Sequence, residues 1–422
     1  MTSPPRDIAP FEAPLDARVR PPGSKSETVR ALAAASLADG RSHLYAPLLA
    51  EDPEAMAESL RGLGISIETG TEPWTVDGQG GRFSPPGRPI DANESGLSAR
   101  ILLAIAGSLD GVTLVVGRGR LPERPMSGVV DALRSQGVEV RGDRLPIEVT
   151  GRGRLWGGRV VVDCSESSQF ATAMMLVAPI MHEPCSLELE GLIGSADYLE
   201  GTASIMRRFG ATIERTTTGF EIANRGYEAS DIVIEPDASA AVYPMAMAAI
   251  TRGRVVIEGL GESSWQPDLR VAAVLADMGC RVDWDPRSVT VDARDAELSG
   301  VDVDMSDAPD GALAVSVVAL FATGPTRISG LHSLRLKESD RLVAISEEIT
   351  RVGGGADIDG DTLIVTPGDL HGGVIDPHGD HRIAMAMATA GSGVAGIQIA
   401  DSQVVNKTWP GFWVFLDTLT RA

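Results

Sequence analysis

One alternation of helix-like and strand-like patterns recurs five times along the chain. In each copy, apolar residues at helical spacing end at a glycine, and a short run of alternating apolar and polar residues follows. The helical ends read ESLRGLG, DALRSQG, SIMRRFG, AVLADMG and EEITRVGGG. Glycine is typical of a helix C-terminus because it adopts positive φ at little cost. The alternation that follows predicts half-buried strands.

The glycines of the five copies are almost evenly spaced. They are separated by 73, 73, 69 and 75 residues and are Gly64, Gly137, Gly210, Gly279 and Gly354. Such a period indicates duplicated supersecondary units, against the alternative of chance similarity among α/β segments. A sixth helix is predicted at 413–419, and the strand it lacks is predicted near Ala17–Arg20. The pattern therefore predicts six units, three per domain, with one domain built from both chain ends.

Size and composition narrow the class of protein. A chain of 422 residues is too long for one ordinary core, so two domains are expected. The net charge of -21 disfavours binding to nucleic acid or to an anionic membrane. The three cysteines form no CxxC pair, which argues against a disulfide framework or a zinc site. With no signal-like start and no long apolar run, we expect a cytoplasmic protein.

Cationic side chains recur where predicted helices begin. Taken singly, each is explained by an exposed side chain or an ion pair. Their repetition is unexpected because a helix dipole disfavours cations at its N-terminus. Free N–H groups at such termini bind anions, so the repetition predicts a shared site for an anionic substrate. The residues are Lys25, Arg30, Arg100, Arg124, Lys337, Arg341, Arg382 and Lys407.

Two helix starts carry groups suited to phosphate or hydroxyls. In GSKS, Gly23 and Ser24 lead into a predicted helix whose first turn holds Lys25 and Ser26. The earlier glycine of GxxxxGK[ST] is absent, so a nucleotide-hydrolase loop is disfavoured. In the second, SSQF at 167–170 places three uncharged hydrogen-bonding side chains before an apolar helix, where a simple N-cap needs only one.

Acids occupy the later segments. Asp310 precedes a helix that is apolar nearly all round, so it is either the N-cap or a positioned base. Lys337 and Arg341 are expected on one helix face, with an anion between them or with salt bridges to Glu338 and Asp340. DPHGDHR at 376–382 resembles a metal-binding cluster, but the arginine within it argues against a further cation.

Taken in order, these motifs carry a resemblance to a known family. PGSKS with Arg30, SSQF, PD, KESDR, DHR and KTWP are similar to the 5-enolpyruvylshikimate-3-phosphate synthase family over nearly the whole chain. The resemblance implies an α/β fold of two inside-out barrel domains, each with three βαβαββ-type units. It implies a discontinuous domain of residues 1–22 and 237–422, an inserted domain of residues 23–236, and an active site in the cleft between them.

The resemblance also implies a reaction. The enolpyruvyl group of phosphoenolpyruvate moves to the 5-hydroxyl of shikimate-3-phosphate by addition and elimination, and phosphate leaves. No metal and no organic cofactor takes part. The implied partners are these two small molecules alone, and the implied oligomeric state is a monomer.

Residue roles follow from the same resemblance. The implied catalytic residues are Lys25, Asp310 and Glu338: Asp310, helped by Lys25, takes the hydroxyl proton, and Glu338 protonates the methylene carbon. The implied contacts with shikimate-3-phosphate are Lys25, Ser26, Arg30, Ser167, Ser168, Gln169, Ser195, Tyr198, Asp310 and Lys337. The implied contacts with phosphoenolpyruvate are Lys25, Arg100, Arg124, Gln169, Glu338, Arg341, His381, Arg382 and Lys407.

Three positions depart from the family pattern. Glu94-Ser95-Gly96-Leu97 stands where Asn-Ala-Gly-Thr is usual, and Val29 and Ser333 replace asparagines. A glutamate near the phosphate of phosphoenolpyruvate would repel it unless the carboxylate pairs with an arginine or turns away. Because Val29 and Ser333 stand near the implied acceptor site, an enolpyruvyl transferase for a different alcohol is an open alternative.

Two further alternatives are less consistent with the residues. UDP-N-acetylglucosamine enolpyruvyl transferase uses a cysteine in the loop that corresponds to residues 117–125, and this loop has none. A non-catalytic anion-binding scaffold would not need both Asp310 and Glu338.

Overall fold

The computed structural model describes residues 4–191 and 197–420, which fold as two compact units. Unit 1 combines Met1–Pro22 with Glu235–Ala422, and unit 2 is Gly23–Ile234. Each unit has its own core of buried apolar side chains. Among the described residues, no helix is both long enough and apolar enough to cross a membrane.

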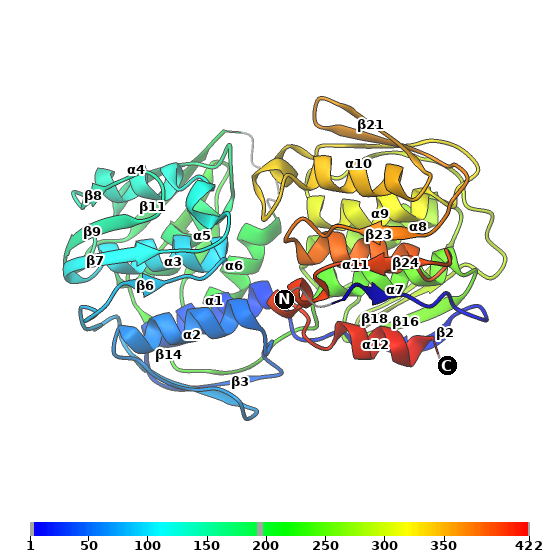
Figure 1. The fold of residues 1–422 in the computed structure, drawn as a ribbon. Coiled ribbons are helices and arrows are strands. Elements are labelled where there is room, and N and C mark those ends of the chain that lie inside the picture. The colour runs from blue at the N-terminus through cyan, green and yellow to red at the C-terminus, as the bar shows by residue number, and fades with distance from the viewer. Residues whose placement is uncertain (1–3, 192–196, 421–422) are drawn as a thin grey trace. The chain divides into compact units, whose positions relative to one another are not determined.

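In each of the three sheets of unit 2, one or two strands pair parallel with a central strand, and an antiparallel hairpin completes the sheet (Figure 1). The first sheet has the order β14 (Tyr227–Glu228), β3 (Ala38–Tyr45), β5 (Trp74–Gln79) and β4 (Ser66–Glu68), and β15 (Asp231–Val233) also pairs with β3. The second has the order β6 (Ile90–Asp91), β7 (Asp110–Val116), β9 (Ile147–Arg152) and β8 (Glu139–Arg141). The third has the order β10 (Gly158–Asp163), β11 (Cys185–Glu190), β13 (Gly219–Ile222) and β12 (Ile213–Arg215).

The helices of unit 2 divide into two sets. Helices α1 (Lys25–Leu37), α3 (Gly96–Gly107) and α5 (Gln169–Val177) are buried almost all round and pack against one another. Their many alanines allow that close approach. Helices α2 (Glu51–Gly62), α4 (Ser127–Ser135) and α6 (Asp197–Arg208) each bury only one face. The first turns of the central helices carry the candidate anion-binding residues.

Unit 1 repeats this plan in two of its three sheets, whereas the third has three strands, one parallel and one antiparallel to the central strand. The first sheet has the order β17 (Arg281–Asp285), β18 (Ser288–Asp292), β16 (Arg254–Glu258) and β2 (Asp16–Val19). The second has the order β19 (Asp302–Asp304), β20 (Thr326–Ser329), β22 (Thr362–Thr366) and β21 (Gly355–Asp359). The third has the order β1 (Arg6–Asp7), β24 (Ile397–Ile399) and β23 (Gly373–Ile375). Helices α7 (Ala238–Ile250), α9 (Ala312–Ala319) and α11 (His381–Ala390) pack together, whereas α8 (Arg270–Asp277), α10 (Arg341–Arg351) and α12 (Phe412–Leu419) bury one face.

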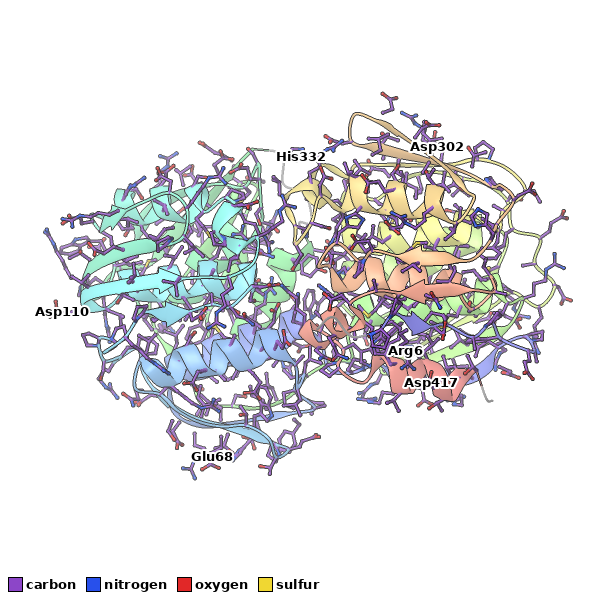
Figure 2. The ribbon with its side chains drawn as sticks, in the orientation of Figure 1. Arg6, Glu68, Asp110, Asp302, His332 and Asp417 are labelled. Carbon is purple, nitrogen blue, oxygen red and sulfur yellow. The ribbon has the colours of Figure 1, made fainter. Side chains whose placement is uncertain are left out.

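The two chain ends meet within unit 1. Strand β2 pairs parallel with β16, with Ala17 opposite Val255, and this confirms the strand predicted near Ala17–Arg20. Helix α12 confirms the sixth helix predicted at 413–419. Arg6 donates two hydrogen bonds of 2.7 Å to the carboxylate of Asp417, so the first strand is tied to the last helix (Figure 2).

The glycine pattern was correct at four positions and wrong at the fifth. Gly64, Gly137, Gly210 and Gly279 all adopt positive φ after their helices. After α10 the residue with positive φ is Gly353, not Gly354. A side chain at Gly353 would also collide with the carbonyl of Asp369. Gly354 is small for another reason, since an added Cβ there would meet the Leu320 side chain.

Candidate active site

In unit 2, helix α1 begins as the GSKS segment predicts. The Ser24 hydroxyl caps the helix by accepting from the Glu27 amide at 3.3 Å, and Lys25 and Ser26 form its first turn. The Lys25 ammonium lies 3.4 Å from the carboxylate of Asp52, a buried residue of α2. Sequence analysis missed Asp52. Its only signal was an acid in the first turn of a neighbouring helix, which ordinarily serves the helix dipole.

The Arg30 guanidinium joins three helices of unit 2. Its Nε donates to the Thr202 hydroxyl at 2.8 Å, and Nη1 donates to the Ser26 carbonyl at 3.0 Å. The same Nη1 makes a short contact with the Ser26 hydroxyl, and the guanidinium lies 5.8 Å from the centre of the Tyr198 ring. Arg30 is only 1% exposed, and burial lowers its pKa to about 10. The structure therefore brings Ser26, Arg30 and Tyr198 together as expected.

Two further arginines of unit 2 lie over the start of α3. Arg100 donates from Nη1 to the Gln169 amide oxygen at 2.5 Å and from Nη2 to the Pro125 carbonyl at 2.8 Å. A Cβ added at Gly96 would stand 2.8 Å from the guanidinium atoms of both Arg100 and Arg124. Gly96 thus leaves room for two buried guanidinium groups at a helix N-terminus, a place suited to an anion.

The SSQF segment begins α5. The Ser168 side chain makes no capping hydrogen bond, whereas the Ser167 hydroxyl accepts from the backbone N–H of Gln169 at 3.3 Å. The interpretation that a simple cap does not account for all three polar side chains is consistent with this geometry. Ser195, another implied contact, lies outside the described residues.

Glu94 turns onto the arginine-rich loop that follows β7. Its carboxylate occupies the space that a side chain at Gly119 would need, and Gly119 has a φ of 55°. The Glu94 carboxylate therefore lies against the backbone of the loop at residues 117–120. The other departures are a buried valine in α1, Val29, and a half-buried serine at Ser333.

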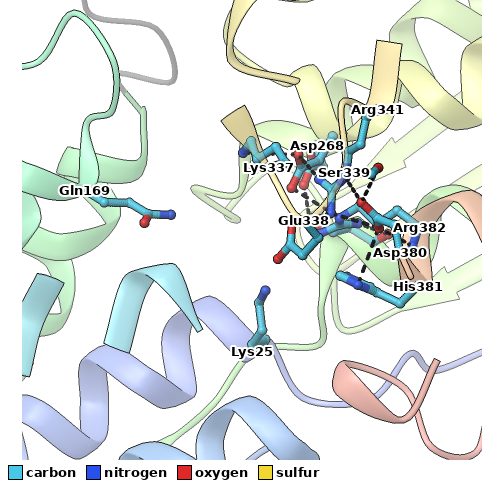
Figure 3. Close-up of polar contacts among 12 residues, drawn as sticks. Lys25, Gln169, Asp268, Lys337, Glu338, Ser339, Arg341, Asp380, His381 and Arg382 are labelled. Carbon is cyan, nitrogen blue, oxygen red and sulfur yellow. Dashed lines mark hydrogen bonds and ion pairs between the residues drawn. The ribbon is translucent and has the colours of Figure 1, made fainter. Parts of the chain in front are cut away.

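In unit 1, Arg341 is the hub of a buried ionic network (Figure 3). Its Nη1 donates to Asp310 at 2.8 Å, its Nη2 to Glu338 at 2.8 Å, and its Nε to Asp380 at 2.7 Å. The Arg341 side chain is 2% exposed. One guanidinium thereby holds the two implied catalytic acids at fixed positions.

Asp310 is not a helix cap. Gly311 precedes α9, and no side chain caps that helix. The Asp310 carboxylate instead faces three cations: Arg341, Lys337 at 3.3 Å and Arg382 at 3.2 Å. Of the two alternatives left by the sequence, this geometry favours the positioned base.

The expectation that Lys337 and Arg341 share a helix face was wrong. Lys337 lies in the bend between the 3-10 turn His332–Leu336 and α10, which begins only at Arg341. The two cations still lie close together because both bind Asp310. The bend, and not helical spacing, brings them together. The alternative of local salt bridges is partly correct, since Arg341 pairs with Glu338, whereas Asp340 caps α10.

The remaining implied residues of unit 1 line the same network. The Lys407 ammonium is 3.6 Å from the second oxygen of Glu338. Asp380 caps α11, accepts from the Ser339 hydroxyl at 3.1 Å, and lies 3.6 Å from the buried ring of His381. Arg382 donates to the carbonyl of Ser239 at 3.3 Å. Ser239, Ser339 and Asp380 were not among the predicted contacts, although Ser339 and Asp380 lie in segments that the sequence analysis singled out.

Electrostatics distinguish the acids of unit 1. Burial opposes ionisation of Asp310, but Lys337, Arg382 and Arg341 outweigh it and hold its pKa well below the ordinary value. Burial likewise opposes the charge of Arg382, yet Asp310 and other acids raise its pKa well above normal. Asp310 is therefore an ionised carboxylate, ready to accept a proton from a group placed against it.

One other cluster contains potential metal ligands. The ligand atoms of Glu347, Glu348 and His378 lie within 4.8 Å of one another. The buried Glu348 carboxylate also accepts from Arg351 at 2.8 Å, so a cation already occupies its side. This cluster serves to attach the loop before α11 to α10.

Each unit carries groups suited to anionic substrates. Unit 2 offers buried guanidinium groups and a lysine at helix N-termini. Unit 1 offers two carboxylates held by arginines and flanked by lysines. Such groups can bind phosphate and carboxylate groups and can move protons.

Comparisons with known proteins agree with this chemistry. The family model for EPSP synthase (3-phosphoshikimate 1-carboxyvinyltransferase) matches residues 11–416. The chain is 40% identical over 407 residues to the 3-phosphoshikimate 1-carboxyvinyltransferase of Methanoculleus marisnigri, covering 95% of this chain and 96% of that protein. It is 35% identical over 422 residues to the enzyme of the same name from Rhizobium etli, covering 98% and 96%.

Solved structures share the fold. EPSP synthase from Acinetobacter baumannii superimposes with a TM-score of 0.83 at 24% identity, covering 99% of this chain and 98% of that one. The enolpyruvyl transferase NikO from Streptomyces tendae gives 0.76 at 18% identity, with coverages of 99% and 98%. From the family match and the curated relatives, this chain belongs to the EPSP synthase family, the 3-phosphoshikimate 1-carboxyvinyltransferases.

Proposed function

We propose that this chain transfers the enolpyruvyl group of phosphoenolpyruvate to the 5-hydroxyl of shikimate-3-phosphate. Its relatives are named 3-phosphoshikimate 1-carboxyvinyltransferases, which agrees with this proposal. The observation that carries the proposal is the shared guanidinium of Arg341, which binds Asp310 and Glu338 at 2.8 Å each. A base and an acid held on one rigid group are suited to a reaction that removes one proton and adds another.

In the addition step, Asp310 accepts the proton of the acceptor hydroxyl, whose oxygen bonds to C2 of phosphoenolpyruvate. Glu338, in its protonated form, gives its proton to C3, so the double bond becomes a methyl group. Lys337 and Lys407 lie against these two acids and stabilise the charges that change during the step. Lys25 supports the removal of the hydroxyl proton.

In the elimination step, the bond between C2 and the phosphate oxygen of the tetrahedral intermediate breaks. The methyl group returns a proton to Glu338, which restores the double bond. Asp310 gives the proton it took from the hydroxyl to the departing phosphate, so inorganic phosphate leaves and both acids return to their starting charges. A cationic environment favours departure of the phosphate because it stabilises the negative charge that develops on the leaving oxygen.

The assignment of substrate contacts follows the family resemblance. We assign shikimate-3-phosphate to Lys25, Ser26, Arg30, Ser167, Ser168, Gln169, Ser195, Tyr198, Asp310 and Lys337. We assign phosphoenolpyruvate to Lys25, Arg100, Arg124, Gln169, Glu338, Arg341, His381, Arg382 and Lys407. The buried Arg30, with a lowered pKa and hydroxyl partners, gains a counter-charge when an anion binds. We further propose a monomer that acts in the cytoplasm, where its three buried thiols stay reduced.

The test is a direct assay. Purified protein is mixed with both substrates without added metal, and phosphate release is followed together with product mass. Release of phosphate with formation of the enolpyruvyl ether supports the proposal, and Asp310→Ala and Glu338→Ala should then abolish turnover. No turnover overturns the acceptor assignment. In that case, protection of Lys407 and Arg124 from chemical modification by phosphoenolpyruvate alone would redirect the search to other alcohols.

A further inference from the structure

Unit 1 contains a second buried acid beside the site that none of the implied roles uses. Asp268 lies in the 3-10 turn Pro267–Leu269, just before α8, and is 1% exposed. Its Oδ2 accepts a short hydrogen bond from the Ser239 hydroxyl. Its Oδ1 faces Gly311, where an added Cβ would stand 3.6 Å away, so the carboxylate lies against the residue that follows Asp310. Figure 3 draws Asp268 with the network of Arg341.

Asp268 and Arg382 are connected through Ser239. The Arg382 guanidinium donates to the carbonyl of Ser239, the residue whose hydroxyl binds Asp268. The charges of Asp310, Asp268 and Asp237 all act on Arg382, and the buried hydroxyl of Tyr243 lies beside it. One buried cation is therefore balanced by several acids, of which Asp310 is the acid proposed to change its charge.

This arrangement addresses a physical problem in the proposed reaction. While Asp310 is ionised, it neutralises Arg382 directly at 3.2 Å. Once Asp310 has accepted a proton, that compensation is gone, and an uncompensated buried guanidinium is strongly unfavourable. A second carboxylate that stays ionised would remove the penalty. It would also make Asp310 a stronger base, because a nearby negative charge favours the protonated form of a carboxyl group.

We propose that Asp268 is a positioning residue, the standing counter-ion that holds Arg382 in place while Asp310 carries the transferred proton. The inference rests on the proposed function. Asp268 acts through Arg382 and Asp310 and needs no contact with either substrate. Burial and repulsion from the ionised Asp310 raise the pKa of Asp268, whereas Arg382 and the Ser239 hydroxyl favour its charged form. The repulsion ends once Asp310 is protonated, so the charged form of Asp268 is favoured at the stage when it must balance Arg382.

The test variant is Asp268→Asn, which removes the charge but keeps the shape and an oxygen that can accept from Ser239. The matched control is Glu348→Gln, an isosteric change at another buried acid of unit 1 that binds an arginine.

Rates are expressed per active site, counted by calorimetric binding of shikimate-3-phosphate. Asp268→Asn should lower kcat at least tenfold, with KM for shikimate-3-phosphate within threefold of wild type. Its solvent deuterium isotope effect on kcat should rise, because removal of the hydroxyl proton becomes slower. Glu348→Gln should leave kcat and the isotope effect near wild type.

A second arm needs no activity and separates this inference from the proposed function. Urea unfolding is measured for wild type, Asp268→Asn, Arg382→Gln and the double variant. If the two residues form a charge pair, the double variant is more stable than the sum of the single losses predicts. If Asp268→Asn does not fold alone, the double variant should still fold.

The outcomes divide cleanly. Additive stability losses, or failure of the double variant to fold, overturn the counter-ion role. Coupled stabilities with an unchanged kcat and isotope effect overturn the link to Asp310. If the wild-type protein lacks the transfer activity, the proposed function fails, and the stability arm still decides whether Asp268 balances Arg382.

Discussion

Arg30 in α1 of unit 2 and Arg382 in α11 of unit 1 are both buried arginines near the start of a central helix, yet their environments differ. Arg30 is held by hydroxyls and a backbone carbonyl, and burial lowers its pKa to about 10. Around Arg382, burial has the same direction but acids outweigh it, and the pKa rises well above normal. The same side chain at the same depth is thus under-compensated in one unit and fully compensated in the other.

The difference indicates a division of labour. An under-compensated guanidinium attracts an anionic ligand, since the ligand supplies the charge that the protein does not. A fully compensated network instead fixes the positions and charges of its acids, which proton transfer requires. On the proposed function, Arg30 of unit 2 serves chiefly to bind an anion. The compensated arginines of unit 1 would fix the acids that move protons, in addition to their proposed contacts with phosphoenolpyruvate. Four substitutions would break or sharpen this comparison.

The largest expected effect is a loss of turnover when the proposed base Asp310 is replaced. Asp310→Asn keeps the shape of the side chain but removes the base, and kcat should fall by about 10²- to 10⁴-fold, the usual contribution of a general base. Steady-state rates at saturating substrates provide the measurement. Asp307→Asn, at an exposed acid of the same loop, is the control and should retain activity. An Asp310→Asn protein with more than a tenth of wild-type activity would contradict the role of the carboxylate.

The second substitution tests compensation through stability. Arg341→Met leaves Asp310, Glu338 and Asp380 without their common partner, and unfolding free energy should fall by about 3–5 kcal/mol, as for other broken buried pairs. Urea unfolding monitored by tryptophan fluorescence measures this loss. A small loss would mean that the acids find other partners, and the fixed geometry argued for unit 1 would be wrong.

Arg30→Met is the counterpart in unit 2, and its expected pattern is the reverse. Removing an under-compensated cation should change unfolding free energy by about 1 kcal/mol or less. KM for shikimate-3-phosphate should rise at least about thirtyfold, equivalent to about 2 kcal/mol of lost binding. Arg41→Met, at an exposed arginine paired with Asp77, is the control for charge alone. A large stability loss with little change in KM would remove the contrast between the units.

Sequence pattern predicted the architecture well because repeats and helix ends are local signals. The glycines at 64, 137, 210 and 279 and the terminal strand and helix all lie where periodicity placed them. The error at Gly354 is a shift of one residue in a run of three glycines, where local pattern cannot select among neighbours.

The candidate site was less accessible to local reasoning, because its members meet through tertiary packing. Arg341 contacts Asp310 and Asp380, 31 and 39 positions away. Asp52 and Asp268 were missed since each resembles an ordinary acid in the first turn of a helix or of a 3-10 turn. The expected helix through Lys337 failed because the chain bends there to bring the lysine onto Asp310. The recurrence of cations at helix starts linked the distant lysines and arginines in advance, but only the family resemblance added Asp310 and Glu338 to the same site.

The smallest expected effect concerns Glu94, the acid that departs from the family pattern within the anion-binding unit. Gly119→Ala should displace the Glu94 carboxylate and strain a backbone with a φ of 55°. We expect a loss of about 1 kcal/mol in unfolding free energy from the positive φ. We also expect KM for phosphoenolpyruvate to rise about threefold to tenfold, because displacing the Glu94 carboxylate changes the electrostatic field at the proposed phosphoenolpyruvate contacts.

Gly153→Ala is the matched control, since Gly153 has a φ of 87° and open space around an added Cβ. It should show the loss in stability without the change in KM. The double substitution Glu94→Ser with Gly119→Ala removes the displaced carboxylate and should restore KM while the stability loss remains. If KM stays high in the double variant, the strained backbone of the loop, and not the charge of Glu94, governs binding. In that case the conformation of the loop, and not electrostatic repulsion by Glu94, would determine how well unit 2 binds phosphoenolpyruvate.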